Sequence, residues 1–249
     1  MVARVRVPAQ RFEVGLRPDE ADRLALELAK MELARAAPRM GAPDLDEIRT
    51  CRRAWLETAM PSHVVDVQTF EIDVYPVTNS QWSTYVEKHG AQPAARDGNP
   101  ENFVTGISWH EAMQYAMNHG GELPTEAEWE CAARVDRRLF TWGDAYGPQG
   151  DVAFTPPVLE TYKVGSRPAT ANPRGIHDML GEFGEYTSSE FRPYPNANVA
   201  AFERLWPNWN GQRVQRGGYD TRQDATTVSR RGVPANERRT HIKFRVVRR

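Results

Sequence analysis

The hydrophobic pattern of the first 60 residues changes from strand-like to helical. Apolar and charged residues alternate over residues 2–14, which predicts a short strand that ends at Gly15. Leucines and alanines recur at helical spacing over residues 19–35, and a second apolar stripe covers residues 44–59. We therefore expect two amphipathic helices to follow the first strand, the first of them starting at Pro18.

The middle of the chain alternates between strand and helix patterns. Residues 61–77 are rich in β-branched and aromatic residues and predict strand structure, and residues 79–88 predict a short helix. Two further helices are expected to open with capping boxes, in which a serine or threonine is followed three residues later by a glutamate. These boxes are Ser108 with Glu111 and Thr125 with Glu128.

Helical periodicity stops at about Gly143. The remaining residues are dense in glycine, proline, asparagine and tryptophan, and only residues 213–216 and 243–247 have the pattern of strands. Long irregular loops often carry function because they lie on the surface of a rigid scaffold. The pattern as a whole indicates an α+β fold with a loop-rich C-terminal half.

Composition and charge narrow the function classes. The chain has 249 residues, of which 40% are hydrophobic and 26% charged, and its formal net charge is −1. This balance is typical of a globular domain and does not favour nucleic acid or an anionic membrane as a partner. No stretch approaches the roughly 20 apolar residues that cross a bilayer, and residues 1–8 lack a signal-peptide core. We therefore expect a cytoplasmic protein.

Two local features need separate interpretation. The only cysteines are Cys51 and Cys131, which are too far apart in sequence for a zinc motif made of cysteines. The last 20 residues are rich in arginine. We expect these arginines to pair with carboxylates elsewhere in the fold, although a phosphate-binding or nucleic-acid-binding face is the alternative.

Four ordered blocks resemble the formylglycine-generating-enzyme family, whose members have the sulfatase-modifying-factor fold. The most specific block is the run Leu-Pro-Thr-Glu-Ala-Glu-Trp-Glu at residues 123–130. The resemblance implies one C-type-lectin-like domain over residues 1–249, with residues 16–60 as a helical insertion. It also implies a buried polar network that includes Glu126, Trp129 and Arg134. In order, the four blocks are residues 70–79, residues 106–112 with 123–134 and 142–143, residues 172–186, and residues 216–218 with 244–247.

The residues for the family's metal chemistry are missing. Its copper oxidases use two cysteines, which would fall near Arg222 and Thr227 here, and neither side chain replaces a thiolate on Cu(I). We therefore expect no copper. A second branch uses an iron site on an added helical domain with clustered histidines, but residues 16–60 contain no histidine. No two of the six histidines have helical spacing.

The loop at residues 181–186 departs from the family pattern. In many relatives it supplies oxygen ligands to a structural calcium, and Glu182 and Glu185 would keep such ligands. Gly184 stands where relatives have a tryptophan, so either a cavity opens beside Glu185 and Tyr186 or another side chain, such as Trp206 or Trp209, fills the space. Lys243 replaces a glycine, which indicates a moved loop or a side chain that points outward.

Two functions remain open at this point. The first is a module that recognises a protein, peptide or small molecule through the loops at residues 187–212 and 219–241, because tryptophan, tyrosine and arginine dominate binding surfaces. Its candidate anchors are Tyr194, Trp206, Trp209, Tyr219, Arg222 and Arg230.

The alternative is a tailoring oxidoreductase that acts on a peptide or small metabolite with a non-copper or metal-free site. Its candidate acid–base residues are Glu185, Tyr186, His177 and His241. In either case the helices at residues 16–60 offer a surface for an oligomer or a larger complex.

Overall fold

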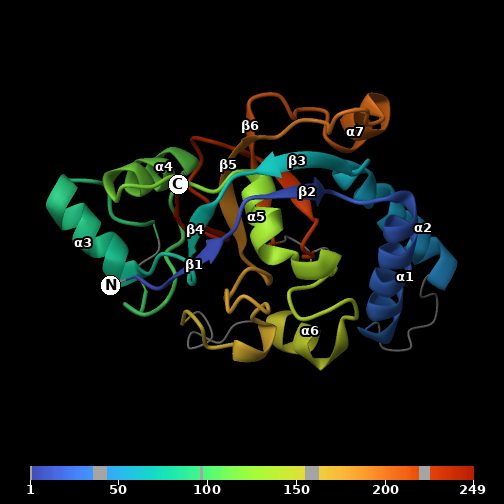
Figure 1. Ribbon diagram of the computed structural model, residues 1–249, viewed down its shortest axis with the longest axis horizontal. Coiled ribbons are helices and arrows are strands. Elements are labelled where there is room, and N and C mark those ends of the chain that lie inside the picture. Colours follow the sequence, from blue (N-terminus) through green and yellow to red (C-terminus); the bar gives the residue numbers. More distant parts are fainter. Residues whose placement is uncertain (1, 36–43, 96–97, 155–162, 219–224) are drawn as a thin grey trace.

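Three small sheets organise the molecule (Figure 1). The computed structural model describes residues 2–35, 44–95, 98–154, 163–218 and 225–249. The first sheet has the order β1-β4-β9 and is antiparallel, so the N-terminal and C-terminal strands flank the same central strand. The three strands are β1 (Arg4–Val7), β4 (Phe70–Asp73) and β9 (Val247–Arg248).

The other two sheets lie on either side of the candidate functional region. The antiparallel pair comprises β2 (Gln10–Val14) and β3 (His63–Val67). The four-stranded sheet has the order β7-β6-β5-β8, and its β5–β8 pair is parallel. Its strands are β5 (Gly184–Glu190), β6 (Gln212–Arg216), β7 (Arg230–Pro234) and β8 (Ile242–Lys243).

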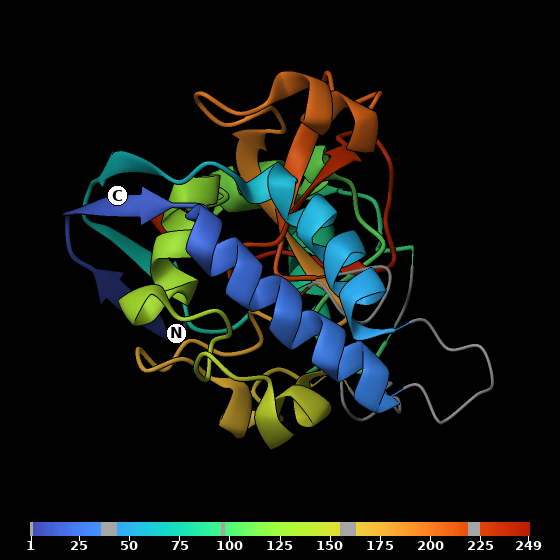
Figure 2. The same cartoon turned by 90° about the vertical axis from the view of Figure 1, so that its right-hand side faces the viewer.

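Helices surround these sheets. Figure 2 shows α1 and α2 side by side across one face of the molecule. The apolar side of α1 enters the main core through Ala21, Leu24, Ala25 and Leu28. The described helices are α1 (Pro18–Arg35), α2 (Leu45–Leu56), α3 (Asn79–His89), α4 (Trp109–Asn118), α5 (Glu126–Ala133), α6 (Gly147–Phe154) and α7 (Val199–Leu205), with short 3-10 segments at Glu57–Ala59, Val135–Arg137 and Pro168–Thr170.

The helix starts predicted from sequence are confirmed. Ser108 and Thr125 each accept a hydrogen bond from the backbone N–H three residues on, and the glutamate at that position accepts one from the backbone N–H of the cap residue. Thr78 forms the same motif at α3. The strands are shorter than predicted, since residues 2–14 and 61–77 each form two strands that pair with distant segments.

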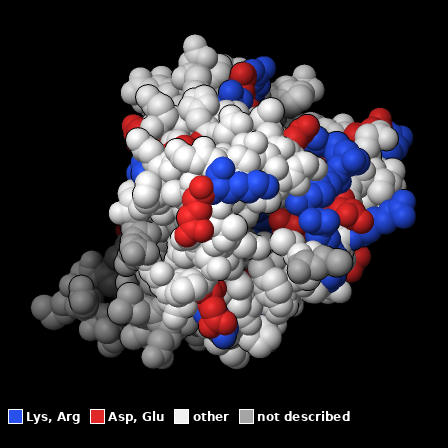
Figure 3. All heavy atoms as spheres, turned by 90° about the vertical axis from the view of Figure 1, so that its left-hand side faces the viewer, with Lys and Arg blue, Asp and Glu red and all other residues white. Residues whose placement is uncertain are grey.

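The basic C-terminal run is neutralised by carboxylates, as predicted. Each pairing joins an arginine of the last 20 residues to an acidic side chain, and on the face drawn in Figure 3 acidic side chains lie among the basic ones. The run therefore reinforces the fold. The pairs are Arg230 with Glu126, Arg238 with Glu111, Arg239 with Glu237, Arg245 with Glu185, Arg248 with Asp73, and Arg249 with Glu122 and Glu128.

Among the described residues, no helix is both long enough and apolar enough to cross a membrane.

The backbone at Gly218 lies directly on that of Gly184. A Cβ added at Gly218 would stand 1.8 Å from the Gly184 nitrogen, so neither chain segment has room for a side chain. We predict that Gly218→Ala lowers the free energy of unfolding by about 3 kcal/mol or more, because overpacking against backbone forces the two segments apart.

Gly120→Ala is the control, measured by urea unfolding beside Gly218→Ala. Gly120 has a φ of +69° but no atom within 4 Å of an added Cβ, so it reports only the backbone cost of about 1–2 kcal/mol. Equal losses in the two variants would refute the close contact.

Candidate functional site

Glu126, the first residue of α5, is the centre of a buried ion-pair network. Its Oε1 accepts hydrogen bonds from Arg216 Nη1 at 2.9 Å, Arg230 Nε at 2.6 Å and the Tyr194 hydroxyl at 3.0 Å. One turn along the helix, Glu130 Oε2 accepts from Arg216 Nη2 at 2.8 Å. Two carboxylates on one face of α5 are therefore joined by guanidinium groups from β6 and β7.

The network extends to the start of α1. Glu130 Oε1 accepts from the Gly15 backbone N–H at 2.9 Å and from Arg134 Nη1 at 3.3 Å. Arg134 in turn donates to Glu20 in the first turn of α1. Arg137 donates to the same carboxylate. Through these bonds α5 fixes the start of α1, and the predicted burial of Arg134 is confirmed by its exposure of 1%.

Electrostatics favour the ionised forms in this network. Burial alone would raise the pKa of the Glu126 carboxyl, but the charges of Arg230 and Arg216, together with the hydrogen bonds of Arg230 and Tyr194, lower it. The pKa of Tyr194 is raised by burial and by the Glu126 charge, so its hydroxyl remains protonated and donates to that carboxylate. The network is a fixed set of charges at neutral pH.

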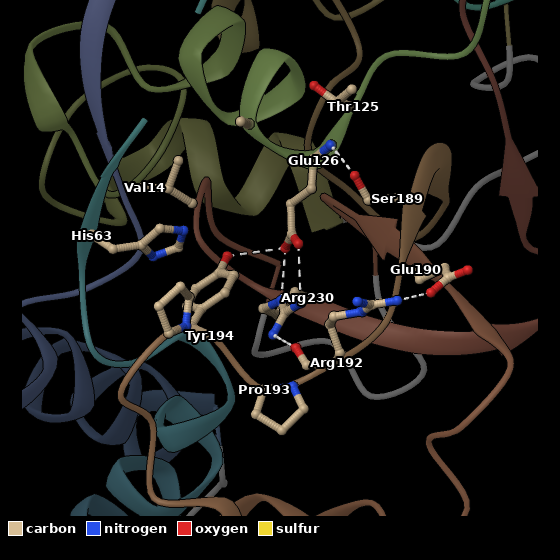
Figure 4. A pocket seen from close by; sticks show the side chains of 12 residues that line it. Val14, His63, Thr125, Glu126, Ser189, Glu190, Arg192, Pro193, Tyr194 and Arg230 are labelled. Atoms are coloured by element: carbon tan, nitrogen blue, oxygen red, sulfur yellow. Dashed lines mark hydrogen bonds and ion pairs between the residues drawn. The ribbon is translucent and has the colours of Figure 1, made fainter. Parts of the chain in front are cut away.

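A hollow of about 630 Å³ lies above this network, and we call it the Glu126 hollow (Figure 4). Glu126, Tyr194 and Arg230 form its floor, and all three are buried. The wall comes from β2, β3, the start of α5, the end of β5 and the segment that follows it. The lining residues are Val14, His63, Thr125, Glu126, Ala127, Ser189, Glu190, Arg192, Pro193, Tyr194, Pro195 and Arg230.

Most polar groups of the hollow already have partners. Arg230 Nη1 donates to the carbonyls of Thr58 and Arg192, and the Ser189 hydroxyl accepts from the Glu126 backbone N–H at 2.9 Å. Thr125 caps α5, so the helix start offers no free site for an anion. A ligand must therefore use the wall and the rim.

His63 is the exception in the wall. Its ring packs edge-on against Tyr194 with the centroids 4.6 Å apart, and its buried Nδ1 has no hydrogen-bond partner among the described residues. At the rim, the exposed side chains of Glu190 and Arg192 pair with each other. An imidazole beside a pair of opposite charges can bind a small zwitterion and can accept or donate a proton.

The predicted ligand anchors fall into three groups. Tyr194 and Arg230 meet in the Glu126 hollow, but both are floor residues whose polar groups are already bonded. Trp206 and Trp209 lie elsewhere, in an aromatic cluster with Phe191 and Phe202. The remaining anchors, Tyr219 and Arg222, lie outside the described residues.

Glu185 has a structural environment that argues against a catalytic or metal-binding role. Arg245 donates to both of its carboxylate oxygens at 2.7 Å, and Trp129 Nε1 donates to Oε2 at 2.8 Å. Burial would raise the pKa of Glu185, but the charge and hydrogen bonds of Arg245, the Lys243 charge and the Trp129 bond lower it. Its neighbour Tyr186 is also buried and donates its hydroxyl to the Ile107 carbonyl at 3.1 Å.

The expected calcium ligands therefore do not fit a cation. Glu185 is fully buried between two cationic side chains, Arg245 and Lys243, whereas Glu182 is half-buried in the turn that precedes β5. Within the described part of the chain, no group of three histidine, cysteine, aspartate or glutamate side chains is placed to hold a metal ion. A hard cation needs several oxygen ligands around it, and Glu185 offers none that is free.

The two histidines predicted as acid–base groups lie apart from the Glu126 hollow. The His177 ring packs beside Tyr75 with centroids 5.0 Å apart, and its buried Nδ1 has no partner among the described residues. The His241 carbonyl accepts from the Gly184 backbone N–H at 3.1 Å. Neither residue lines a described pocket.

The space left by Gly184 is filled by Gln215, and neither tryptophan proposed for that role lies there. A Cβ on Gly184 would stand 2.1 Å from Gln215 Nε2, so no cavity opens beside Glu185. Of the two explanations offered for Lys243, a moved loop or an outward side chain, the second is wrong. Its side chain is buried, and Nζ donates to the Phe183 carbonyl at 2.6 Å and lies 3.8 Å from Glu185 Oε1.

The residues present do not fit a copper dithiolate. Thr227, at one expected cysteine position, donates its hydroxyl to the Arg138 and Leu139 carbonyls at 2.7 and 3.1 Å. The cysteines themselves are in other places, since Cys51 is exposed on α2 and Cys131 is buried in α5. No other thiol exists in the chain.

Sequence reasoning missed His63, Glu190 and Arg192. His63 opens a strand without any chemical motif around it, and it reaches the hollow because β3 pairs with β2 in the register that sets His63 opposite Val14. Glu190 and Arg192 lie within the loop region predicted as a recognition face. The Glu-x-Arg spacing near the start of the expected loop at residues 187–212 was the available signal.

Comparisons with known proteins agree with this architecture. A family model described as "Sulfatase-modifying factor enzyme 1-like domain" matches residues 36–249. Hercynine oxygenase of Mycobacterium tuberculosis is 32% identical over 66% of this chain and 48% of the relative. Formylglycine-generating enzyme of Streptomyces coelicolor is 35% identical over 49% of this chain and 43% of the relative. Among solved structures, PvdO from Pseudomonas aeruginosa has a TM-score of 0.60 at 19% identity, covering 98% of this chain and 93% of that one.

Glu126→Gln tests the network. We predict a loss of about 3–5 kcal/mol in the free energy of unfolding, because removing one charge leaves buried guanidinium groups without their partner. Since folding lowers the Glu126 pKa from its ordinary 4.5, this contribution is complete above about that pH and is lost as pH falls below it.

Glu27→Gln serves as the control, because Glu27 forms an exposed pair with Lys30 that is worth less than about 0.5 kcal/mol. Denaturant unfolding at pH 7 and at pH 3 measures both variants. A Glu126→Gln protein as stable as wild type at pH 7 would contradict a network held by this carboxylate.

Lys243 gives a second pH-dependent prediction. Burial lowers the pKa of its ammonium from 10.5 to about 8, although the Glu185 charge acts in the opposite direction. Between these two values the unfolded chain binds more protons than the folded one, so stability should rise with pH.

Lys243→Met removes this titration. We expect the wild type to gain up to about 3 kcal/mol relative to the variant between pH 8 and pH 10.5. Urea unfolding of both proteins at each pH checks this. Parallel profiles across the range would mean that burial does not lower the pKa of Lys243.

Proposed function

The chain belongs to the sulfatase-modifying factor enzyme 1-like domain family, and we propose that it is a tailoring oxidoreductase acting on a small metabolite or peptide. The observation that carries this proposal is the similarity to hercynine oxygenase over 66% of the chain. It favours the enzyme hypothesis over the recognition module. The chain spans about half the length of the curated relatives it matches, so the reaction itself is part of the proposal.

The substrate would enter the Glu126 hollow. Its floor is already neutralised, so the charges that a substrate meets are those of Glu190 and Arg192 at the rim. A zwitterion can exchange with this exposed pair, its carboxylate on Arg192 and its cation on Glu190, because exposed ion pairs hold their partners weakly. Hercynine, a betaine of histidine, has both charges and a flat ring.

His63 would act as the acid–base group of the proposed reaction. Its ring lines the wall of the hollow, its Nδ1 has no partner among the described residues, and Tyr194 packs against the ring edge-on. An imidazole is suited to this task because its ordinary pKa lies near neutrality. No step is assigned to copper, because the residues at the expected thiolate positions do not fit it.

A recognition module remains the second candidate. The hollow is open to solvent and its floor is fixed by the buried network, which suits a ligand that binds and leaves unchanged. The two functions differ in one observable, since the module binds without turnover.

Oxygen uptake tests the proposal. The purified chain is incubated in air with hercynine, histidine or short peptides, with copper and iron supplied one at a time, and oxygen is followed with an electrode. Uptake that depends on one substrate supports the oxidoreductase. Saturable binding by calorimetry with no uptake under any condition supports the recognition module instead.

Once a substrate and a metal that give oxygen uptake are known, two variants test the site. We predict that His63→Gln lowers kcat about 100-fold or more, the usual range for loss of an acid–base group. Arg192→Gln should raise KM about tenfold through the loss of one charge-assisted hydrogen bond.

His177→Gln is the matched control, because His177 is also half-buried with an unpartnered Nδ1 but lies outside the hollow. If His177→Gln abolished turnover while His63→Gln did not, the active site would lie beside Tyr75 and the assignment to the Glu126 hollow would be wrong.

A further inference from the structure

The turn that leads into β6 contains the dipeptide Asn210-Gly211, which is the only Asn-Gly pair in the chain. Both residues are exposed, and they lie between the end of α7 and the start of β6. The Gln212 backbone N–H donates to the Trp209 carbonyl at 3.2 Å and closes the turn, in which Gly211 has a φ of +78°. Glycine adopts this left-handed conformation without strain, so the pair suits the turn.

An asparagine that precedes a glycine can react with its own backbone. The Gly211 backbone nitrogen attacks the side-chain carbonyl carbon of Asn210, loses its proton to water and expels the side-chain nitrogen as ammonia. The two groups belong to neighbouring residues, so the reaction is intramolecular and favoured by proximity. Its product is a five-membered cyclic imide.

Water then opens the imide at one of its two carbonyls. Opening at the side-chain carbonyl gives aspartate, whereas opening at the backbone carbonyl gives isoaspartate, in which the main chain runs through the side-chain carbon. In the sum of the steps one water enters and one ammonia leaves. No atom is oxidised or reduced, and no cofactor is needed.

The structure leaves this reaction open at Asn210. A Cβ built on Gly211 would have no atom within 4 Å, so neither a side chain nor a neighbouring segment crowds the ring that must form. The Gly211 N–H makes no hydrogen bond to another described residue, and neither does the Asn210 carboxamide. The attacking nitrogen can therefore give its proton to water, and the leaving group is not held in place.

Other asparagines differ from Asn210 in the residue that follows them. Asn99 and Asn172 precede prolines, which have no backbone N–H. Asn196 is exposed, but the N–H of the next residue, Ala197, donates to a carbonyl within its own turn at 3.0 Å. Asn208 is also exposed and lies only two positions before Asn210, but a tryptophan follows it. It is therefore the matched comparison.

We propose that Asn210 is a site of spontaneous deamidation in the folded protein. The product adds a negative charge to a surface hollow of about 440 Å³, whose lining includes His110 and Asn236 but no carboxylate, lysine or arginine. The isoaspartate form also lengthens the main chain of the turn directly before Gln212, where β6 begins its pairing with β7. The proposal is independent of oxidoreductase activity.

Peptide mass spectrometry of the whole protein, incubated at pH 7 and at pH 9, tests this. The tryptic peptide of residues 205–213 contains both Asn208 and Asn210, so its fragment ions compare them within one molecule. We expect the conversion of amide to acid at Asn210 to be about tenfold faster or more, since a steric difference of about 1.4 kcal/mol in the transition state is a factor of ten. The rate should rise with pH, because the attacking nitrogen must lose its proton.

Asn210→Gln is the diagnostic variant, with Asn208→Gln as its control, and ion-exchange chromatography follows the acidic product. Asn210→Gln should remain a single charge species, because glutamine would have to close a larger ring. Asn208→Gln should become acidic at the rate of the wild type. Both residues are exposed, so neither change removes a buried contact.

The free peptide of residues 205–213 separates the effect of the sequence from that of the fold. If Asn210 deamidated in the peptide but stayed intact in the folded protein over the same time, the turn would protect it and the proposal would be wrong. Equal conversion at Asn208 and Asn210, or an acidic product that still forms in Asn210→Gln, would also overturn it.

Discussion

The pairing of two buried carboxylates on α5 with guanidinium groups from two strands is the interaction on which the rest of the structure depends. Glu126 and Glu130 are one helical turn apart, and Arg216 spans both. A buried pair of this kind gives little net stability compared with apolar packing, but it does not tolerate the loss of one partner. It therefore specifies which segments meet: β6 and β7 from the C-terminal half, and α1 through Glu20 and Arg134.

A second buried pair repeats the principle at the other end of the four-stranded sheet. Glu185 on β5 is held by Arg245, which also donates to the carbonyls of Asp73 and His177. This pair ties the C-terminal segment to the first sheet and to the loop that precedes β5. Between the two pairs, Trp129 donates to Glu185 and lies beneath Arg216, whose guanidinium carbon is 5.3 Å from the ring centroid. Such anchors join segments that have little regular secondary structure.

Local chemistry explains what could be predicted from sequence and what could not. Capping boxes at Ser108 and Thr125 involve residues three apart, so they are visible in the sequence and set the helix starts correctly. Sheet register and buried ion pairs join residues that local patterns do not connect, such as Arg245 with Glu185, which are 60 positions apart, and Arg230 with Glu126, which are 104 positions apart. Glu185 illustrates the consequence: an acidic residue in a loop-like motif reads as a ligand for a cation, whereas the fold surrounds it with Arg245 and Lys243. His63 is the converse, an unremarkable strand residue that pairing with β2 delivers to a hollow.

The pairing of buried carboxylates with arginines also limits which residues can act on a ligand. Because the buried carboxylates of Glu126 and Glu185 accept their hydrogen bonds from arginines and neighbouring side chains, they hold the fold together and are not available to a ligand. Groups still able to act are those at the edges of this network, where a polar atom has lost water without gaining a protein partner. The His63 imidazole is such a group: its ring lines the Glu126 hollow, and its Nδ1 has no partner among the described residues. Tyr194 packs against this ring and also donates to Glu126, so the buried network sets where the imidazole lies.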